Sequence, residues 1–225
     1  MAKPMFDADA LISAFENATA QQGAQLKKAV SDATLASLQG RELTLKNIRA
    51  ALKAVTDAAS AGAAKNLTSG VDAGALLDQA VAGMDQALLK AVEANRVALG
   101  QLVSQGADLR EKHLKKALAD LDAMEDSFIG AIKKAADAAG TQAGQAWAPV
   151  LEKLQAGGTL SGAKAATTAE QFLGQMHTAM RDSRAAGLKA AQTLAESYAA
   201  LVSGVLIGMS DALTQGQPKA AAKKK

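Results

Sequence analysis

The side chains that could do acid–base or metal chemistry are few in this chain and lie far apart. The two histidines, His113 and His177, fall in different expected helices, and neither has neighbouring histidines or carboxylates at metal-ligand spacing. The densest acidic cluster, four carboxylates within residues 120–126, lacks the glycine-containing loop and ligand spacing of a calcium site. We therefore expect no metal site, and we interpret both histidines as surface or seam residues.

Signatures of other catalytic chemistry are also missing from the sequence. The chain has no cysteine, which excludes disulfides, thiolate zinc sites and a cysteine nucleophile, and which fits a reducing compartment. Ala-Gly-Gly-Thr at 156–159 lacks the Gly-Lys-Ser/Thr ending of a phosphate-binding loop. We expect no catalytic residue and no cofactor, and we interpret the protein as non-enzymatic.

The C-terminal tail is the feature whose residue types favour binding of polyanions. Four of the 25 basic residues lie in the last eight positions, and without them 21 basic residues face 22 acidic ones. An Ala/Lys/Pro segment buries too little apolar area to order itself, so residues 215–225 are expected to form a disordered arm. Weak, non-specific, salt-sensitive contact with nucleic acid is expected from its lysines, which are Lys219, Lys223, Lys224 and Lys225.

The most apolar stretch of the chain lies between Glu196 and Asp211, which enclose 14 uncharged residues. It is too short to span a bilayer, because a transmembrane helix needs about 20 apolar residues. Its candidate contacts with a hydrophobic surface or partner are Tyr198, Leu201, Val202, Val205, Leu206, Ile207 and Met209. A stripe of small residues suited to close helix packing consists of Ala200, Gly204, Gly208 and Ala212. Two readings stay open: a central bundle helix or oligomer contact, and docking on an apolar surface.

Composition predicts the secondary structure that must position these residues. The chain has 55 Ala among 225 residues, six aromatic residues and three Pro. Alanine is the best helix former but buries little area, so we expect an all-α protein with thin packing. Long amphipathic helices should form an antiparallel hairpin or elongated bundle with coiled-coil-like packing.

Apolar residues at three- and four-residue intervals predict two long helices, over 7–66 and 73–139, after an N-terminal extension of residues 1–6. Asp7 or Asp9 is the expected first N-cap and Asp72 the second. At about 1.5 Å per residue each helix would approach ~90–100 Å, with the hairpin turn near residues 66–73.

A composition shift predicts a hinge over residues 140–162. A short helix should open at Trp147-Ala148-Pro149 and end at Gly157-Gly158. A last long helix is expected over 163–214, before the basic tail. The N-terminus lacks the apolar stretch of a secretory signal, so a cytoplasmic protein is expected.

Two further patterns have structural and functional interpretations. Glu42, Lys46, Arg49 and Lys53 form a charged stripe that we interpret as a solvated helix face. Isolated glycines within the expected helices indicate close helix approach or simple tolerance, or else adaptability to a curved or changing surface.

An Ala-rich, cysteine-free helical chain with an Ala/Lys/Pro end resembles the phasins, the proteins that coat bacterial polyhydroxyalkanoate granules. The resemblance covers residues 7–225, and residues 218–225 look like a shortened form of the Lys/Ala/Pro tails that attach granules to the nucleoid in some phasins. Residues 39–48 and 196–204 look similar to an uncharacterised phasin-like proteobacterial group. The resemblance implies a protein that coats a granule, and it transfers no catalytic residue. A homo-oligomer is also expected.

The leading hypothesis is a phasin-like protein that binds a polyhydroxyalkanoate granule through amphipathic helices, with residues 198–209 as the contact. One alternative is a soluble coiled-coil oligomeric scaffold without surface activity. A second alternative is a minor nucleoid-associated protein that acts through its tail.

Overall fold

The computed structural model describes residues 7–182, apart from 19–22, 40–42, 67–70 and 108–110. Within these ranges the chain forms eight α-helices and no strand, which confirms the all-α prediction. The helices are α1 (Ala8–Glu16), α2 (Gly23–Leu38), α3 (Leu45–Asn66), α4 (Ala73–Ser104), α5 (Lys112–Asp122), α6 (Met124–Ala138), α7 (Gly140–Gly157) and α8 (Leu160–Asp182).

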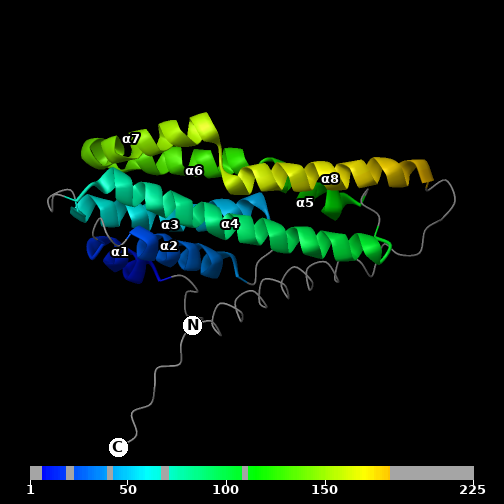
Figure 1. The fold of residues 1–225 in the computed structure, drawn as a ribbon, viewed down its shortest axis with the longest axis horizontal. Helices are drawn as coiled ribbons and strands as arrows, with labels where there is room; N and C mark the ends of the chain where they lie inside the picture. The colour runs from blue at the N-terminus through cyan, green and yellow to red at the C-terminus, as the bar shows by residue number, and fades with distance from the viewer. Residues whose placement is uncertain (1–6, 19–22, 40–42, 67–70, 108–110, 183–225) are drawn as a thin grey trace, which may run out of the picture.

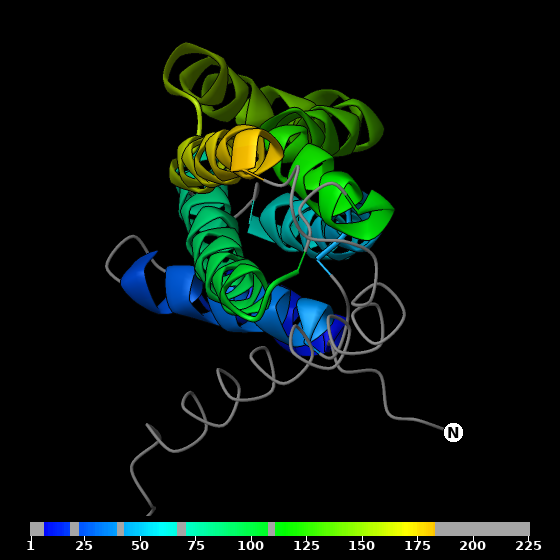
Figure 2. The same ribbon diagram turned by 90° about the vertical axis from the view of Figure 1, so that its right-hand side faces the viewer.

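The helices pack in three layers, with α3 and α4 in the middle (Figures 1 and 2). On one side α1 packs on α3 and α2 packs along α4. On the other side α6 packs on α3, and α8 packs against α4 and α5 in the right half of Figure 1. The middle layer is therefore covered on two faces, which lets Ala-rich helices bury side chains that one hairpin would leave exposed.

The core is built from aliphatic side chains with alanines between them and only a few aromatic rings. Phe15, Phe128 and Trp147 are fully buried. The Trp147 Nε1–H donates a hydrogen bond to Ser60 Oγ at 3.0 Å, which satisfies the polar atom of the buried indole. This contact anchors α7 on α3.

Local capping signals in the sequence are confirmed. Asp7 caps α1 by accepting a hydrogen bond from the Ala10 amide at 3.0 Å, and Asp72 caps α4 by accepting one from Ala75 at 3.1 Å. Gly158 ends α7 with φ of 66°, a conformation that glycine adopts without steric cost.

The two very long helices are not formed. Residues 7–66 contain three helices, of which α1 ends at Glu16 and α2 at Leu38. Residues 73–139 also contain three helices. The first break follows α4, where the chain turns at Gly106 with φ of 90°. The Ala107 amide there donates a hydrogen bond to the Leu102 carbonyl at 2.9 Å. A second break falls at Ala123, between α5 and α6. The apolar spacing is the same in a continuous helix and in two helices that fold back, so spacing alone did not reveal these breaks.

The hinge region also differs from the prediction. Helix α7 begins at Gly140 and not at Trp147, so Pro149 lies inside the helix. Helix α8 begins at Leu160, where the Thr159 hydroxyl accepts a hydrogen bond from the Gly162 amide at 2.9 Å as an N-cap does. The predicted continuation of this helix to residue 214 lies outside the described residues.

One glycine of α4 marks a close helix contact. A Cβ atom at Gly83 would lie 2.5 Å from the Lys27 carbonyl oxygen of α2 and 2.9 Å from Val30 Cβ. At Gly100 of the same helix an added Cβ would meet nothing within 4 Å. The predicted close approach therefore holds at Gly83, while Gly100 is simply tolerated.

Candidate interaction surface

The candidate binding residues named from the sequence, between Tyr198 and Lys225, all lie outside the described residues. This applies to the apolar segment, to the small-residue stripe and to the basic tail. What the structure describes is the helical body from which this part of the chain continues.

The described body brings no cluster of metal-ligating side chains together. His113 is exposed on α5, and His177 lies on α8. Within residues 7–182, the described positions include no group of three or more His, Asp or Glu side chains that could hold a metal ion.

The acidic cluster of residues 120–126 is divided between structural contacts and solvent. Asp120 is buried; its carboxylate accepts a hydrogen bond from the Leu45 amide at 3.3 Å and pairs with Lys116 at 2.7 Å. This carboxylate of α5 thus caps the start of α3, while Asp122 and Asp126 are exposed.

Two more carboxylates hold the start of α8 against the rest of the bundle. Glu125 accepts a hydrogen bond from the Thr159 amide at 2.7 Å. Asp85 of α4 accepts from the Leu160 amide at 3.0 Å and from the Ser161 amide at 2.8 Å. Negative charge is favourable at a helix N-terminus, where these amides have no partner within the helix. Glu125 is therefore a packing residue.

An ion cluster joins α4 to α8 further along. Glu93 accepts hydrogen bonds from Arg96 at 2.5–2.9 Å and pairs with Lys164 at 3.2 Å. These cations, Arg96 above all, lower the pKa of Glu93 from 4.5 to about 2. Because all three side chains are partly exposed, this cluster is a surface link between helices and not a site with unusual reactivity.

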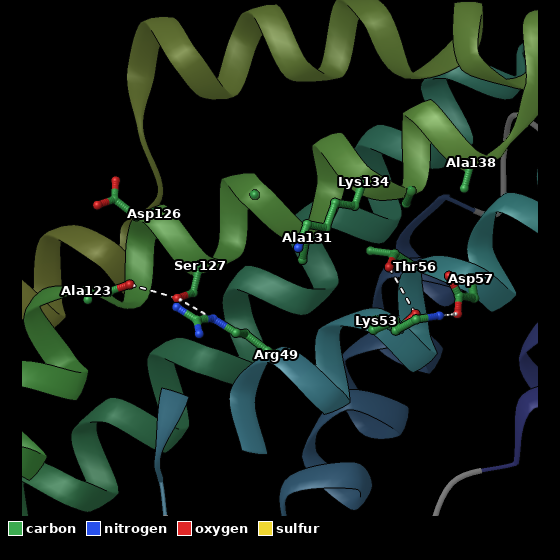
Figure 3. Close-up of a pocket in the computed structure, with 12 residues that line it drawn as sticks. Arg49, Lys53, Thr56, Asp57, Ala123, Asp126, Ser127, Ala131, Lys134 and Ala138 are labelled. Carbon is green, nitrogen blue, oxygen red and sulfur yellow. Dashed lines mark hydrogen bonds and ion pairs between the residues drawn. The ribbon is translucent and has the colours of Figure 1, made fainter. Parts of the chain in front are cut away.

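The feature of the body best suited to binding is a groove of about 660 Å³ between α3 and α6 (Figure 3). Its walls combine charged rims with small apolar side chains. The lining residues are Arg49, Lys53, Thr56, Asp57, Ala123, Asp126, Ser127, Gly130, Ala131, Lys134, Ala135 and Ala138.

The rims of the groove carry three cations and two carboxylates. Arg49 reaches across from α3 and donates from Nε to Ser127 Oγ of α6 at 3.3 Å. Lys53 pairs with Asp57 on its own helix at 2.5 Å. Lys134 extends along α6 toward Ala131 (Figure 3). The groove is therefore slightly basic at its edges and apolar between them, which suits an amphipathic helix with small residues on one face.

Sequence reasoning found one wall of this groove but not the groove. Lys46, Arg49 and Lys53 are exposed, as the charged-stripe interpretation predicted. Glu42 lies outside the described residues, and α3 begins only at Leu45. The sequence signal that could have revealed the other wall is the row of small residues on α6, in which Ala131, Ala135 and Ala138 recur at helical spacing.

Large apolar side chains are otherwise scarce on the described surface. The exposed ones are Val97, Leu160 and Leu173. None of the described helices combines the length and hydropathy that crossing a bilayer requires.

Comparison with known proteins adds a family but no activity. A family model described as a family of unknown function (DUF6781) matches residues 1–215. No curated protein and no solved structure matches the chain significantly. The match extends over most of the chain, including the body with its α3–α6 groove and the apolar stretch that follows it. The chain therefore belongs to the DUF6781 family of unknown function.

Proposed function

We propose that this protein is a non-enzymatic, phasin-like surface protein that associates with a hydrophobic granule, with polyhydroxyalkanoate as the expected surface. Residues 198–209 make the contact, and the helical body carries them. The protein acts in the cytoplasm as a homo-oligomer, and its lysine tail adds weak, non-specific attraction to polyanions.

The observation that carries this proposal is a contrast in apolar side chains along the chain. Among the side chains whose burial the structure describes, the exposed large hydrophobic ones are Val97, Leu160 and Leu173. The sequence between Glu196 and Asp211, by comparison, has 14 consecutive uncharged residues and seven large apolar or aromatic side chains. A segment of this composition provides the area that binding to an apolar surface requires.

The free energy expected from burying these apolar side chains is sufficient for surface binding. Full burial of one Val, Leu, Ile or Met side chain contributes about 1.5–3 kcal/mol. Four such side chains on the contact face would contribute roughly 6–12 kcal/mol, before the cost of ordering the segment on the surface. A helix with this contact face would bind without a membrane-spanning length.

Co-sedimentation with polyhydroxybutyrate granules tests the proposal, with lipid vesicles as the control surface. Val205→Asp places a charge in the apolar segment and should strongly reduce the granule-bound fraction. Val97→Asp makes the same change at an exposed position of α4 and should leave binding unchanged. Circular dichroism must show that both variants stay folded. Equal binding by both variants, or no binding by the unchanged protein, would refute the assignment.

A soluble helical scaffold is the second candidate, favoured by the thorough burial of apolar side chains in the body. In that case the apolar segment is permanently covered by partner helices. A scaffold keeps its mass on dilution, as light scattering would show, and does not bind hydrophobic beads. The nucleoid role ranks third, and it requires a salt-sensitive DNA shift that disappears when residues 219–225 are removed.

A further inference from the structure

The groove between α3 and α6 matches the apolar segment of the same chain in length. Along α6 its lining runs from Ala123 to Ala138, 15 positions or about 22 Å at 1.5 Å per residue. Glu196 and Asp211 are also 15 positions apart, so the same segment in helical form would be about 22 Å long between its two acids.

The two surfaces also match in side-chain size. The alanines of α6 form the apolar part of the groove, and an added Cβ at Gly130 would meet nothing within 4 Å. The segment has its own row of small residues at four-residue spacing, which includes Gly204 and Gly208. Small residues on both sides let two helix backbones approach closely.

Charge favours the same pairing. The groove rims carry three cations, Arg49, Lys53 and Lys134, against two carboxylates, and Lys53 is already paired with Asp57. Residues 196–213 contain two acids and no base. Acids at both ends of the segment face cations at both ends of the groove, which favours the contact in either direction. The length of the tether selects the direction in which Glu196 lies at the Ala123 end.

We propose that residues 196–213 of the same chain occupy the α3–α6 groove in the free protein, as a helix parallel to α6. Glu196 then lies near Arg49, and Asp211 lies near Lys134. Docking covers the small-residue face of the segment, whereas the proposed surface contact uses its large apolar side chains. This inference goes beyond the proposed function, because docking in solution does not depend on the kind of surface.

The chain can reach the groove without rearrangement of the body. The start of α8 adjoins the start of α6, since the Thr159 amide donates to Glu125 at 2.7 Å. Helix α8 has 23 residues and is about 35 Å long. The 13 residues 183–195 extend up to about 45 Å, enough to run back along α8 to the Ala123 end of the groove.

Disulfide trapping tests the docking directly, because the chain has no cysteine of its own. One variant carries Gly130→Cys and Gly204→Cys, which places a thiol in the groove and one in the segment. The matched control carries Gly100→Cys and Gly204→Cys, and at Gly100 an added Cβ also meets nothing within 4 Å. Both purified full-length variants are oxidised with copper phenanthroline at high dilution, and the products are resolved on a non-reducing gel.

The groove pair should form an intramolecular disulfide at least about tenfold faster than the control pair. A docked pair is held in contact, whereas a tethered segment meets a distant cysteine only at the millimolar effective concentration of a flexible linker. Equal rates, or a faster control pair, would overturn the proposal. Disulfides formed mainly between two molecules would overturn it as well, because they assign the groove to a second copy.

A charge exchange adds a second readout. Lys134→Glu in the groove pair should slow trapping by up to about fivefold, since an exposed ion pair contributes up to about 1 kcal/mol. Adding Asp211→Lys to that variant should restore the rate, and failure to restore it contradicts the stated direction of docking. A binding assay with hydrophobic beads distinguishes the docking proposal from the proposed surface function. Disulfide trapping without bead binding would reject the surface function alone, and bead binding without trapping would reject docking alone.

Discussion

The same substitution at two glycines of α4 should have different effects on stability. Gly83→Ala places a methyl group where its Cβ would lie 2.5 Å from the Lys27 carbonyl oxygen and 2.9 Å from Val30 Cβ of α2. The nearest atom belongs to the backbone, so it cannot move aside as the end of a flexible side chain could. Gly100→Ala adds the same group where nothing lies within 4 Å.

The expected magnitudes follow from two opposing effects. Replacing glycine by alanine in a helix interior stabilises by about 1 kcal/mol, and this effect acts in both variants. Overpacking at a tight contact costs about 1–3 kcal/mol and acts only at Gly83. Gly100→Ala should therefore be up to about 1 kcal/mol more stable than the unchanged protein. Gly83→Ala should be less stable than Gly100→Ala by about 1–3 kcal/mol.

Urea unfolding followed by circular dichroism at 222 nm measures this difference. With a slope near 2 kcal/mol per molar urea, the two midpoints should differ by about 0.5–1.5 M at equal slope. Because helix propensity is the same in both variants, the difference isolates the contact between α2 and α4. Equal midpoints, or a higher midpoint for Gly83→Ala, would refute the reasoning that these helices are in close contact.

Two further predictions concern carboxylates that hold α8. Asp85→Ala should lower the free energy of unfolding by about 0.5–2 kcal/mol, since two amides at the start of α8 lose their acceptor. The control is Asp137→Ala, because Asp137 is exposed. An equal loss of stability in both variants, measured by urea unfolding, would contradict the capping role of Asp85. Glu93 has its pKa lowered to about 2, so the stability it contributes is present above about pH 4.5 and is lost as the pH falls toward 2. In melting-temperature profiles the advantage of the unchanged protein over Glu93→Gln should shrink across that window, and a constant gap would show that the ion cluster does not contribute.

The contribution of the binding segment can be separated from that of the body because the changes tested lie on different parts of the chain. Val205→Asp and the Gly204→Cys pairs alter the segment, whereas Gly83→Ala and Asp85→Ala alter helix packing within the described body. A loss of surface binding with an unchanged urea midpoint would thus be assigned to the segment.

Local sequence signals predicted part of this fold well. The all-α class follows from alanine content and the scarcity of proline, because helix propensity acts through each residue and its near neighbours. The caps at Asp7 and Asp72 and the helix end at Gly158 were also predicted, since each depends on hydrogen bonds or backbone angles within a few residues.

The arrangement of those helices required contacts between distant residues. Asp120 caps α3 from 75 positions further along the chain, and Glu125 holds the Thr159 amide across 34 positions. Neither partner can be predicted from local spacing, so the sequence showed both carboxylates only as members of an acidic cluster.

The candidate groove likewise has one wall that the sequence predicted and one that it did not. The sequence alone predicted that Arg49 and Lys53 share a solvated helix face, and that residues 197–210 form the most apolar stretch. Only the tertiary structure placed the alanine row of α6 opposite that face. The reason is physical: periodicity determines which side chains share a face of one helix, whereas the partner of that face depends on where the chain turns, and those turns form wherever folding back buries the most apolar surface.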